Sequence, residues 1–400
     1  MTVVAGPRQV GKTTMVIEAV ASFPNHYVAA EQREPYPPPA VIDIREELTE
    51  TTFDANWLVS QWRYARSETL RLQQAGRLGG GSPSAFVLVI DEIQKIPRWA
   101  EVVKGLWDSD RANRIPLHVV LLGSAPLLVQ KGLSETLAGR FELLRLTHWS
   151  FTEMRSAFGV SLDEFIYFGG YPGSMPMIRN ESRWREYIIG ALVQPNIEKD
   201  ILMMAPVKKP ALLKRLFELG CRYSGRILSY NKMVGQLQDA GNTVTLAHYL
   251  DLLASAELIA GLQQYAGQTV RQRASSPKLN ALNTSLITSS SGYSFAEALA
   301  DRTFWGHLVE SAAGAHLFNT LDSKCRLHYW RDSPHEADFV LSSGGKLLAI
   351  EICSGDSAGA MNGLEAFGKS FPISKFLLVG KGGVPLGEFL AQPASYWLSS

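Results

Sequence analysis

The stretch Gly6-Pro-Arg-Gln-Val-Gly-Lys-Thr13 decides how this sequence folds, because it fits the spacing G-x-x-x-x-G-K-[ST]. It follows the apolar run Val3–Ala5 and opens a helical pattern, which is the strand–loop–helix context that this motif requires. The alternative is an ordinary glycine turn before a threonine-capped helix. The context favours a phosphate-binding loop, made of Gly6, Pro7, Arg8, Gln9, Val10, Gly11, Lys12, Thr13 and Thr14.

Each residue type in this loop has a role in phosphate chemistry. The two glycines let backbone N–H groups wrap a phosphate, and the helix N-terminus adds its positive end. Lys12 is expected to reach the β- and γ-phosphates, and the Thr13 hydroxyl is expected to ligate Mg²⁺.

A second motif, Val87-Leu-Val-Ile-Asp-Glu92, places two carboxylates at the end of an apolar strand. Asp91 is positioned to bind the Mg²⁺ shell, and Glu92 to orient or deprotonate an attacking water. Alone, this pattern would fit a strand followed by two solvated carboxylates. Together with Lys12 it predicts nucleotide hydrolysis, and Glu directly after Asp favours conformational coupling over a kinase reaction.

Two further residues are candidates for catalysis. Ser124 follows the apolar run Leu117–Leu122, whose strand is expected between the loop strand and the Asp-Glu strand. There Ser124 would orient water, unless it is merely a turn residue. Arg140 could reach a γ-phosphate in cis or from a neighbouring subunit, where an arginine can supply about 10³–10⁵ in rate. Its alternative is a structural ion pair.

The first block, residues 1–150, predicts an α/β fold with a doubly wound parallel sheet. Val3–Ala5, Ala85–Ile90 and Leu117–Leu122 are continuous apolar runs typical of buried parallel strands. Residues 54–78 have a helical composition. Pro35–Pro39 and Gly79–Pro83 indicate surface connections.

Composition excludes several classes of protein. The 400 residues carry 39 basic and 38 acidic side chains, a net charge of +1, so no global field attracts nucleic acid or membrane. Three widely separated cysteines indicate neither a disulfide framework nor a zinc site. No apolar run approaches the roughly 20 residues that span a bilayer. These observations predict a cytoplasmic protein without a membrane partner, and an early phosphate loop predicts no secretory signal.

The second block, residues 151–290, is predicted to be mainly helical, and residues 206–278 to form a winged-helix unit. This unit holds 10 basic and 4 acidic residues, and Thr245–Leu258 is its expected recognition helix. The residues expected to meet DNA or RNA phosphates are Arg222, Arg226, Arg271, Arg273 and Lys278. The alternative is the solvated face of an interdomain module. We expect four aromatic side chains to pack in the core rather than to stack on bases: Trp184, Tyr187, Tyr223 and Tyr249.

The chain resembles the AAA-type ATPases of bacteria and archaea that carry a C-terminal domain of unknown function. The resemblance rests on Gly6–Thr14, Ile90–Pro97, Gly123–Pro126, Leu133–Phe141, Phe168–Pro172, Ser275–Lys278, Tyr329–Arg331, Glu336–Phe339 and Ile350-Glu351. It implies that the nucleotide is ATP, in agreement with the absence of an N-K-x-D guanine motif, and that the six residues discussed above take the roles given. Relatives usually carry a segment before the loop strand, which predicts either a longer natural N-terminus or a sheet without that element.

The third block, residues 291–400, resembles a restriction-endonuclease-like α/β domain. A helix is expected around Phe304–Leu317, a hairpin from Glu336–Leu341 and Lys346–Ile352, and a strand at Phe376–Val379. In such nucleases an Asp and a Glu-x-Lys bind Mg²⁺ and position water.

The nuclease motif of this third block is incomplete. Asp338 and Glu351 match it, Glu310 could join them, and Cys353 stands at the lysine position. A thiol cannot replace an ammonium, and nothing in the sequence indicates that Lys346 or Lys369 does so. A domain used for binding or packing is therefore favoured over an active nuclease.

Three hypotheses follow for the whole chain. The leading one is a Mg²⁺-dependent ATPase acting as a nucleotide-driven switch, with DNA, RNA or a protein as partner. The alternatives are a nucleotide-regulated nuclease and a non-hydrolysing ATP-binding scaffold. The partner and the oligomeric state stay open.

Overall fold

The computed structural model describes residues 1–31, 53–78, 85–123, 136–202, 207–239, 241–266, 275–353, 358–371 and 374–399. The chain divides into two compact units, Met1–Leu146 and Thr147–Ser400. Five predictions concern residues outside the described ranges: Pro35–Pro39, Gly79–Pro83, Ser124, Arg271 and Arg273. Within those ranges, no helix is long and apolar enough to cross a membrane.

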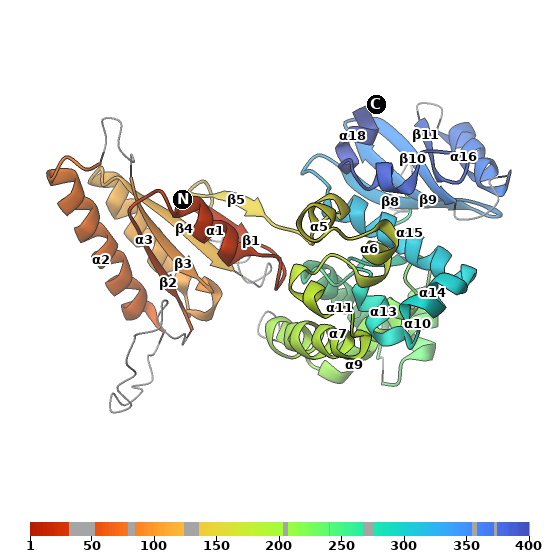
Figure 1. The fold of residues 1–400 in the computed structure, drawn as a ribbon, viewed down its shortest axis with the longest axis horizontal. Coiled ribbons are helices and arrows are strands. Elements are labelled where there is room, and N and C mark those ends of the chain that lie inside the picture. The colour runs from red at the N-terminus through yellow and green to blue at the C-terminus, as the bar shows by residue number, and fades with distance from the viewer. Residues whose placement is uncertain are drawn as a thin grey trace. The chain divides into compact units, whose positions relative to one another are not determined.

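The first unit is built on a five-stranded parallel sheet (Figure 1). Its strands are β1 (Thr2–Ala5), β2 (Asn25–Ala29), β3 (Phe86–Asp91), β4 (Leu117–Gly123) and β5 (Glu142–Arg145). The order β2-β3-β4-β1-β5 places β4 between the loop strand and the Asp-Glu strand, which confirms that prediction. The predicted α/β fold with a parallel sheet is therefore confirmed.

Helices cover both faces of this sheet because successive strand residues point to opposite sides. Val4, Val87 and Val89 pack with helix α1 (Lys12–Val20). Their neighbours Val3 and Leu88 pack on the other face, in the core that includes helices α2 (Ala55–Gln74) and α3 (Trp99–Ala112). The sheet is thus doubly wound, and α2 confirms the helix expected within residues 54–78.

The second unit begins with helices whose starts are marked in the sequence. Ser150 and Ser161 each form a capping box with a glutamate three residues later, which fixes the N-termini of α5 and α6. The helices of this part are α5 (Phe151–Phe158), α6 (Leu162–Phe168), η2 (Pro172–Met177), α7 (Glu181–Glu186), η3 (Tyr187–Val193) and η4 (Asn196–Ile201).

Among the described residues, three helices and a two-stranded sheet occupy the region for which a winged helix was predicted. They are α9 (Pro210–Arg222), α10 (Tyr230–Gln236), α11 (Thr243–Ser255), β6 (Ile259–Leu262) and β7 (Lys278–Ala281). Strands β6 and β7 are antiparallel. The expected recognition helix ends at Ser255, because Leu258 already leads into β6.

A mixed four-stranded sheet completes the second unit, in the order β11-β10-β9-β8. Its strands are β8 (Arg326–Asp332), β9 (His335–Ser343), β10 (Lys346–Cys353) and β11 (Ser374–Gly380). The β9–β10 hairpin and the strand β11 agree with the sequence predictions. The remaining helices are α13 (Ser285–Ser291), α14 (Phe295–Ala300), α15 (Arg302–Asn319), α16 (Ala358–Ser370), α17 (Leu386–Phe389) and α18 (Ala394–Ser399).

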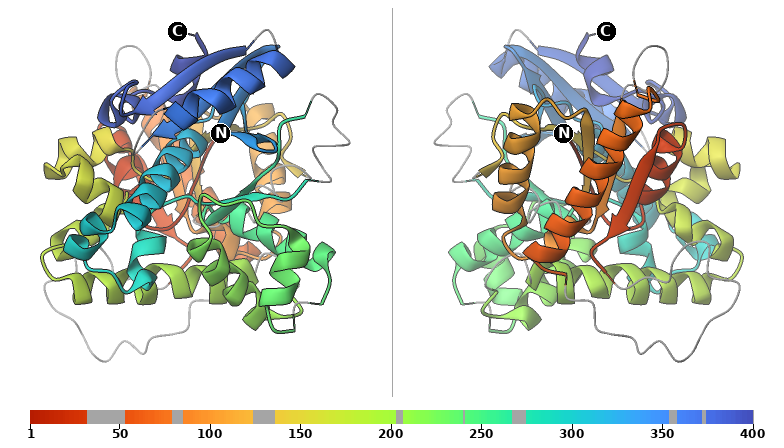
Figure 2. Two further views of the ribbon diagram at one scale, coloured as in Figure 1. Left: turned by 90° about the vertical axis from the view of Figure 1, so that its right-hand side faces the viewer. Right: turned by 90° about the vertical axis from the view of Figure 1, so that its left-hand side faces the viewer.

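Helix α15 links this sheet to the helical part of the unit. Figure 2 shows it between the C-terminal sheet and the helices before it, and it contacts β7, α6 and β10. Gly314 permits the close approach of α15 to β7, since a Cβ at position 314 would lie 2.2 Å from the side-chain oxygen of Asn280 in β7. Residues 147–400 accordingly form one compact unit. The predicted division of this unit at residue 290 stays a prediction.

Candidate functional site

Residues 6–11 connect the end of β1 to the start of α1, and residues 12–14 form the first turn of that helix. Gly11 and Gln9 have positive φ angles, 85° and 61°, which turn the backbone sharply before the helix. Gly6 lies so close to the backbone of Leu146 that a Cβ would be 2.0 Å from its carbonyl oxygen. Packing therefore requires the first glycine of the motif, independently of its predicted phosphate contact.

We expect the substitution Gly6→Ala to destabilise the N-terminal unit by about 1–3 kcal/mol, because the loop must move away from Leu146. Thermal unfolding measures this effect. Gly105→Ala on α3 is the matched control, since its Cβ would meet nothing within 4 Å and should stabilise the helix by about 0.5–1 kcal/mol. Equal melting temperatures for the two variants would contradict the packing argument.

Lys12 is the first residue of α1, yet its side chain is buried inside the loop. Its Nζ atom donates to the carbonyl oxygens of Gly6 at 2.9 Å and Pro7 at 2.6 Å. Only 7% of Lys12 is exposed. The ammonium group is thus held on the inner side of the loop, where the predicted phosphate contact requires it.

The two sequence motifs meet in one hydrogen bond. The Thr13 hydroxyl donates to Oδ2 of Asp91 at 2.8 Å, and the Tyr27 hydroxyl donates to the same oxygen at 2.6 Å. The other oxygen, Oδ1, accepts the backbone N–H of Glu92 at 2.8 Å. Asp91 is 1% exposed. These contacts fix the carboxylate beside Thr13, and Tyr27 is a residue that the sequence analysis did not find.

Glu92 follows Asp91 in a left-handed conformation with φ of 55°. Such a conformation is uncommon for a residue other than glycine and often occurs at functional sites. The Gln94 amide donates to Oε2 of Glu92 at 2.7 Å, and Nζ of Lys95 lies 3.7 Å from that oxygen. Lys95 also pairs with Glu31. The Glu92 carboxylate is therefore oriented by neighbours rather than free to rotate.

These residues suit Mg²⁺ and a nucleotide phosphate. Thr13 and Asp91 offer a hydroxyl and a carboxylate oxygen side by side, and hard oxygen ligands of this kind are those that Mg²⁺ prefers. Lys12 adds a positive charge within a loop of backbone N–H groups at a helix N-terminus.

Of the two other catalytic candidates, the structure describes only Arg140. Ser124 lies outside the described residues, directly after β4. Arg140 binds Asp108 of α3 through two contacts, Nε to Oδ1 at 2.8 Å and Nη2 to Oδ2 at 3.0 Å. This pairing lowers the pKa of Asp108. Contact between Arg140 and a phosphate would require that ion pair to break, so its catalytic role stays a prediction.

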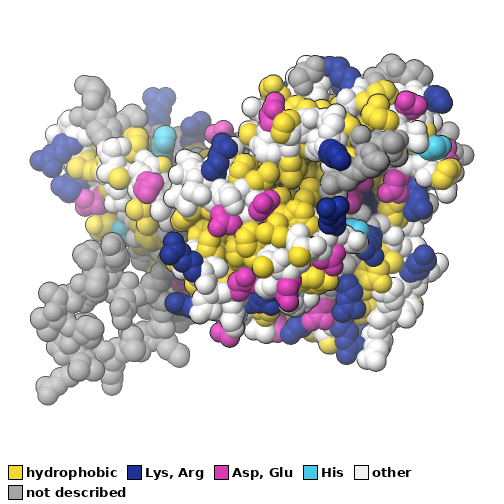
Figure 3. Space-filling view, turned by 45° about the vertical axis from the view of Figure 1, so that its right-hand side comes forward, with side chains coloured by type: hydrophobic (Ala, Val, Ile, Leu, Met, Phe, Trp, Pro, Cys, Tyr) yellow, Lys and Arg dark blue, Asp and Glu magenta, His cyan; other side chains and the backbone are white. Residues whose placement is uncertain are grey.

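The basic region of the second unit offers fewer surface cations than the sequence count suggests. Arg222 and Arg226 are exposed, and Nη2 of Arg226 lies 2.6 Å from Nε2 of His307. Lys278 is only 2% exposed, so its predicted phosphate contact is wrong. On the face shown in Figure 3, basic and acidic side chains are scattered among uncharged ones. Trp184 and Tyr249 are buried, as expected of core residues.

Lys278 instead lies among the three carboxylates of the predicted nuclease motif. Its Nζ atom is 2.6 Å from Oε1 of Glu310 on α15 and 3.0 Å from Oδ1 of Asp338 on β9. Glu351 on β10 accepts the backbone N–H of Asp338 at 3.3 Å. We call these four residues the carboxylate cluster. The other lysines considered from the sequence, Lys346 and Lys369, are exposed.

Burial and mutual repulsion perturb the ionisation of this cluster. Burial, and then the nearby Asp338 charge, raise the pKa of Glu310 to about 8 and that of Glu351 to about 9. Burial alone would lower the pKa of Lys278, but Asp338 and Glu310 outweigh it and raise that pKa above its usual value. Lys278 therefore stays charged while the glutamates tend to hold protons.

We expect the second unit to lose stability as pH rises from about 6.5 toward about 9. A carboxyl whose pKa is higher in the folded chain than in the unfolded chain binds its proton more tightly when folded. The stability that Glu351 contributes is therefore complete below pH 4.5 and is lost as the pH rises toward about 9. His148 acts oppositely, because burial lowers its pKa from 6.5 to about 4 and stability falls as pH drops through that range.

Unfolding in urea across this pH range measures the effect. Glu351→Gln should flatten the alkaline decline, whereas Glu365→Gln, an exposed glutamate of α16, should not. A decline of equal slope in both variants would show that other groups cause it.

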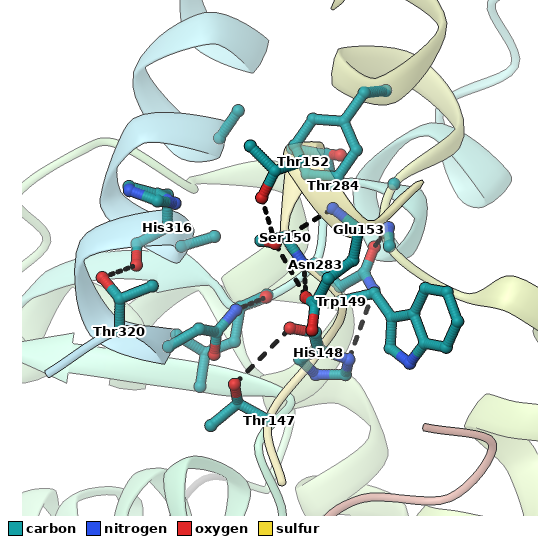
Figure 4. Close-up of a pocket in the computed structure, with 17 residues that line it drawn as sticks. Thr147, His148, Trp149, Ser150, Thr152, Glu153, Asn283, Thr284, His316 and Thr320 are labelled. Carbon is teal, nitrogen blue, oxygen red and sulfur yellow. Dashed lines mark hydrogen bonds between the residues drawn. The ribbon is translucent and has the colours of Figure 1, made fainter. Parts of the chain in front are cut away.

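A separate cavity of about 360 Å³ lies in the second unit between the start of α5 and helix α15 (Figure 4). His148 and Ser150 lie on one side and His316 and Thr320 on the other. Its polar groups are bonded internally: Nε2 of His148 to the Glu257 carbonyl at 2.8 Å, and Nε2 of His316 to the Gln392 carbonyl at 2.7 Å. Burial lowers the pKa of both histidines, so this lining is largely uncharged.

Family models match three parts of the chain. Residues 1–155 match the model described as an AAA domain. The N-terminal unit is thus an AAA-type P-loop ATPase domain. Residues 160–296 and 305–387 match two domains of unknown function, DUF8612 and DUF4143. Neither description mentions a winged helix or a nuclease, so both assignments stay predictions.

Similar proteins are found at low sequence identity. Uncharacterized proteins of Mycobacterium tuberculosis and Mycobacterium bovis are each 25% identical over 407 residues, covering 99% of this chain and 80% of theirs. A Walker-type ATPase of Pyrococcus abyssi aligns with a TM-score of 0.45 and 15% identity, over 72% of this chain and 90% of that one. AMPPCP-bound DnaA from Aquifex aeolicus aligns with a TM-score of 0.29 and 9% identity, over 64% and 82%.

Proposed function

We propose that this protein is a Mg²⁺-dependent ATPase that acts as a nucleotide-driven conformational switch. The observation that carries the proposal is the hydrogen bond from Thr13 to Asp91, which joins the phosphate loop to the Asp-Glu strand. Lys12 inside the same loop adds the charge that a triphosphate requires.

Each residue of this site has a distinct role in the proposed reaction. Lys12 holds the β- and γ-phosphates, while Thr13 and Asp91 hold Mg²⁺, which neutralises charge on the phosphate oxygens. Glu92, held in orientation by Gln94, accepts a proton from the attacking water or aligns it. Ser124 follows the strand between β1 and β3 and is proposed to assist that alignment.

Phosphate release from ATP with and without Mg²⁺ tests the hydrolytic part. We expect Mg²⁺-dependent turnover by the full chain. Nucleotide binding without any phosphate release would instead support the non-hydrolysing scaffold. No binding of Mg·ATP would exclude both.

The switch requires that the bound nucleotide changes the arrangement of the chain. Small-angle scattering of the Glu92→Gln variant with ATP, compared with the same variant with ADP, tests this. We expect different scattering curves for the two complexes, and for Lys12→Ala the same curve with either nucleotide. Indistinguishable curves for Glu92→Gln would exclude a large movement.

Nucleic acid is the proposed partner of the helical region that contains α9, α10 and α11. Arg222 and Arg226 are exposed there, and the order of three helices and two strands supports the winged-helix assignment. Binding to double-stranded DNA and RNA across a salt series tests it. The double variant Arg222→Ala, Arg226→Ala should weaken binding uniformly across sequences and reduce the salt slope by roughly one per lost phosphate contact. No binding would favour a protein partner.

A further inference from the structure

Four elements far apart in the sequence bring the carboxylate cluster together within the second unit. Lys278 begins β7, Glu310 lies on α15, Asp338 on β9 and Glu351 on β10. Lys278 and Asp338 are 2% and 7% exposed, so the ammonium and its main partner are shielded from water. A buried charge is tolerated only when it is paired and hydrogen-bonded.

The Lys278 ammonium is bound by two residues of this cluster. Its Nζ atom donates to Asp338 Oδ1 at 3.0 Å and to the Asp338 carbonyl at 3.1 Å, and it forms an ion pair with Glu310 Oε1 at 2.6 Å. The Nζ atom also lies 4.8 Å from the centre of the Phe339 ring, a cation–π contact. Its burial and these contacts keep the ammonium away from a phosphate in solvent.

Two of the carboxylate oxygens that a metal ion could use are bonded to backbone donors. Oδ2 of Asp338 accepts the backbone N–H of Ile352 at 3.0 Å, and Oε2 of Glu351 accepts the backbone N–H of Asp338. Gly225 lies against the Glu310 carboxylate, where a Cβ would be 3.3 Å from it. The cluster is thus closed around the ammonium on several sides.

Charge balance favours a cation at this position. Three carboxylates in a water-poor environment repel one another, and either protons or a cation must offset them. Carboxylates arranged in this way commonly bind divalent ions, but Mg²⁺ gives up its water shell reluctantly. The Lys278 ammonium is already held in place by β7, so it does not have to enter the site from solvent and lose a water shell.

We propose that Lys278 is the resident cation of a carboxylate site formed by Glu310, Asp338 and Glu351, and that it excludes divalent metal from this site. The lysine comes from β7 rather than from the position of Cys353, and it neutralises the carboxylates instead of contacting a substrate. The site therefore does not support metal-dependent cleavage of nucleic acid. This inference does not depend on the proposed ATPase activity.

Binding of Mn²⁺ to the nucleotide-free full chain, followed by electron paramagnetic resonance, tests the proposal. We expect Lys278→Met to bind one more Mn²⁺ per chain than the wild type. The double variant Lys278→Met, Asp338→Asn should lose that additional ion. Lys346→Met, which removes an exposed lysine at the β9–β10 turn, is the matched control and should bind as the wild type does.

Three results would overturn the proposal. One is a folded Lys278→Met variant that gains no ion. Another is Mn²⁺ bound at the cluster of the wild-type chain, which would be detected if Glu351→Gln bound one ion fewer than the wild type. This comparison tests the proposal even if Lys278→Met does not fold. Cleavage of DNA or RNA by the wild type with Mn²⁺, absent in Asp338→Ala, would also overturn it.

Discussion

The substitution Lys12→Ala is expected to weaken ATP binding about 10- to 100-fold and to reduce turnover about 100- to 1,000-fold. The Lys12 ammonium is buried inside the loop and held by the carbonyl oxygens of Gly6 and Pro7, so no other cation of the loop can take its place without rearrangement. In the proposed reaction, its loss removes charge-assisted hydrogen bonds to the β- and γ-phosphates that strengthen as charge develops on the leaving phosphate. Calorimetric titration with Mg·ATP measures the first effect and phosphate release the second.

Lys104→Ala, which removes an exposed lysine of α3 in the same unit, is the matched control and should leave binding and turnover unchanged. Thermal unfolding without nucleotide separates a lost phosphate contact from a collapsed loop, because Lys12 also donates to two loop carbonyls. Unchanged turnover in a folded Lys12→Ala variant would remove the basis of the ATPase proposal.

The phosphate loop and the Asp-Glu strand could be predicted because their chemistry is local. The loop residues are consecutive, and β3 is buried along its whole length, so its apolar run is visible in the sequence. The strands that were not predicted, β2 and β5, lie at the two edges of the sheet. All four residues of β5 are exposed, and an exposed edge strand has no apolar run to reveal it.

The residues that support the site were harder to predict, because tertiary packing selects them. Tyr27 reaches Asp91 from β2, and nothing in its sequence context marks that contact. Gln94 could have been found, since it stands in the motif Ile90–Pro97. Its role depends on the left-handed turn at Glu92, which brings its amide back to the carboxylate.

Lys278 shows the limit of counting charges along a sequence. It was included with the basic residues of region 206–278, yet the fold buries it in the carboxylate cluster. The motif Ser275–Lys278 was recognised, but the sequence contains no signal that pairs it with Asp338, 60 residues later. Similarly, Gly169 and Gly170 are explained only by packing, since Cβ atoms there would lie 2.0 Å from the Asn283 side-chain oxygen and 2.2 Å from the Trp149 carbonyl.

The substitution Glu92→Gln is expected to reduce ATP turnover about 100- to 10,000-fold while ATP binding is retained. Glutamine keeps the size of the side chain and an acceptor oxygen for Gln94, but it cannot take a proton from water. Lys12, Thr13 and Asp91 are unchanged in this variant. Single-turnover phosphate release and calorimetric titration measure the two quantities separately.

Glu101→Gln is the matched control, because Glu101 is 56% exposed and pairs with Arg98 at the start of α3, and we expect wild-type turnover from it. Undiminished turnover in Glu92→Gln would mean that another group activates water, or that the measured hydrolysis comes from a contaminant.

The variant also separates binding from hydrolysis in the search for a partner. A molecule that co-purifies with Glu92→Gln in ATP, but not with Lys12→Ala, depends on the bound nucleotide and therefore identifies what the switch holds.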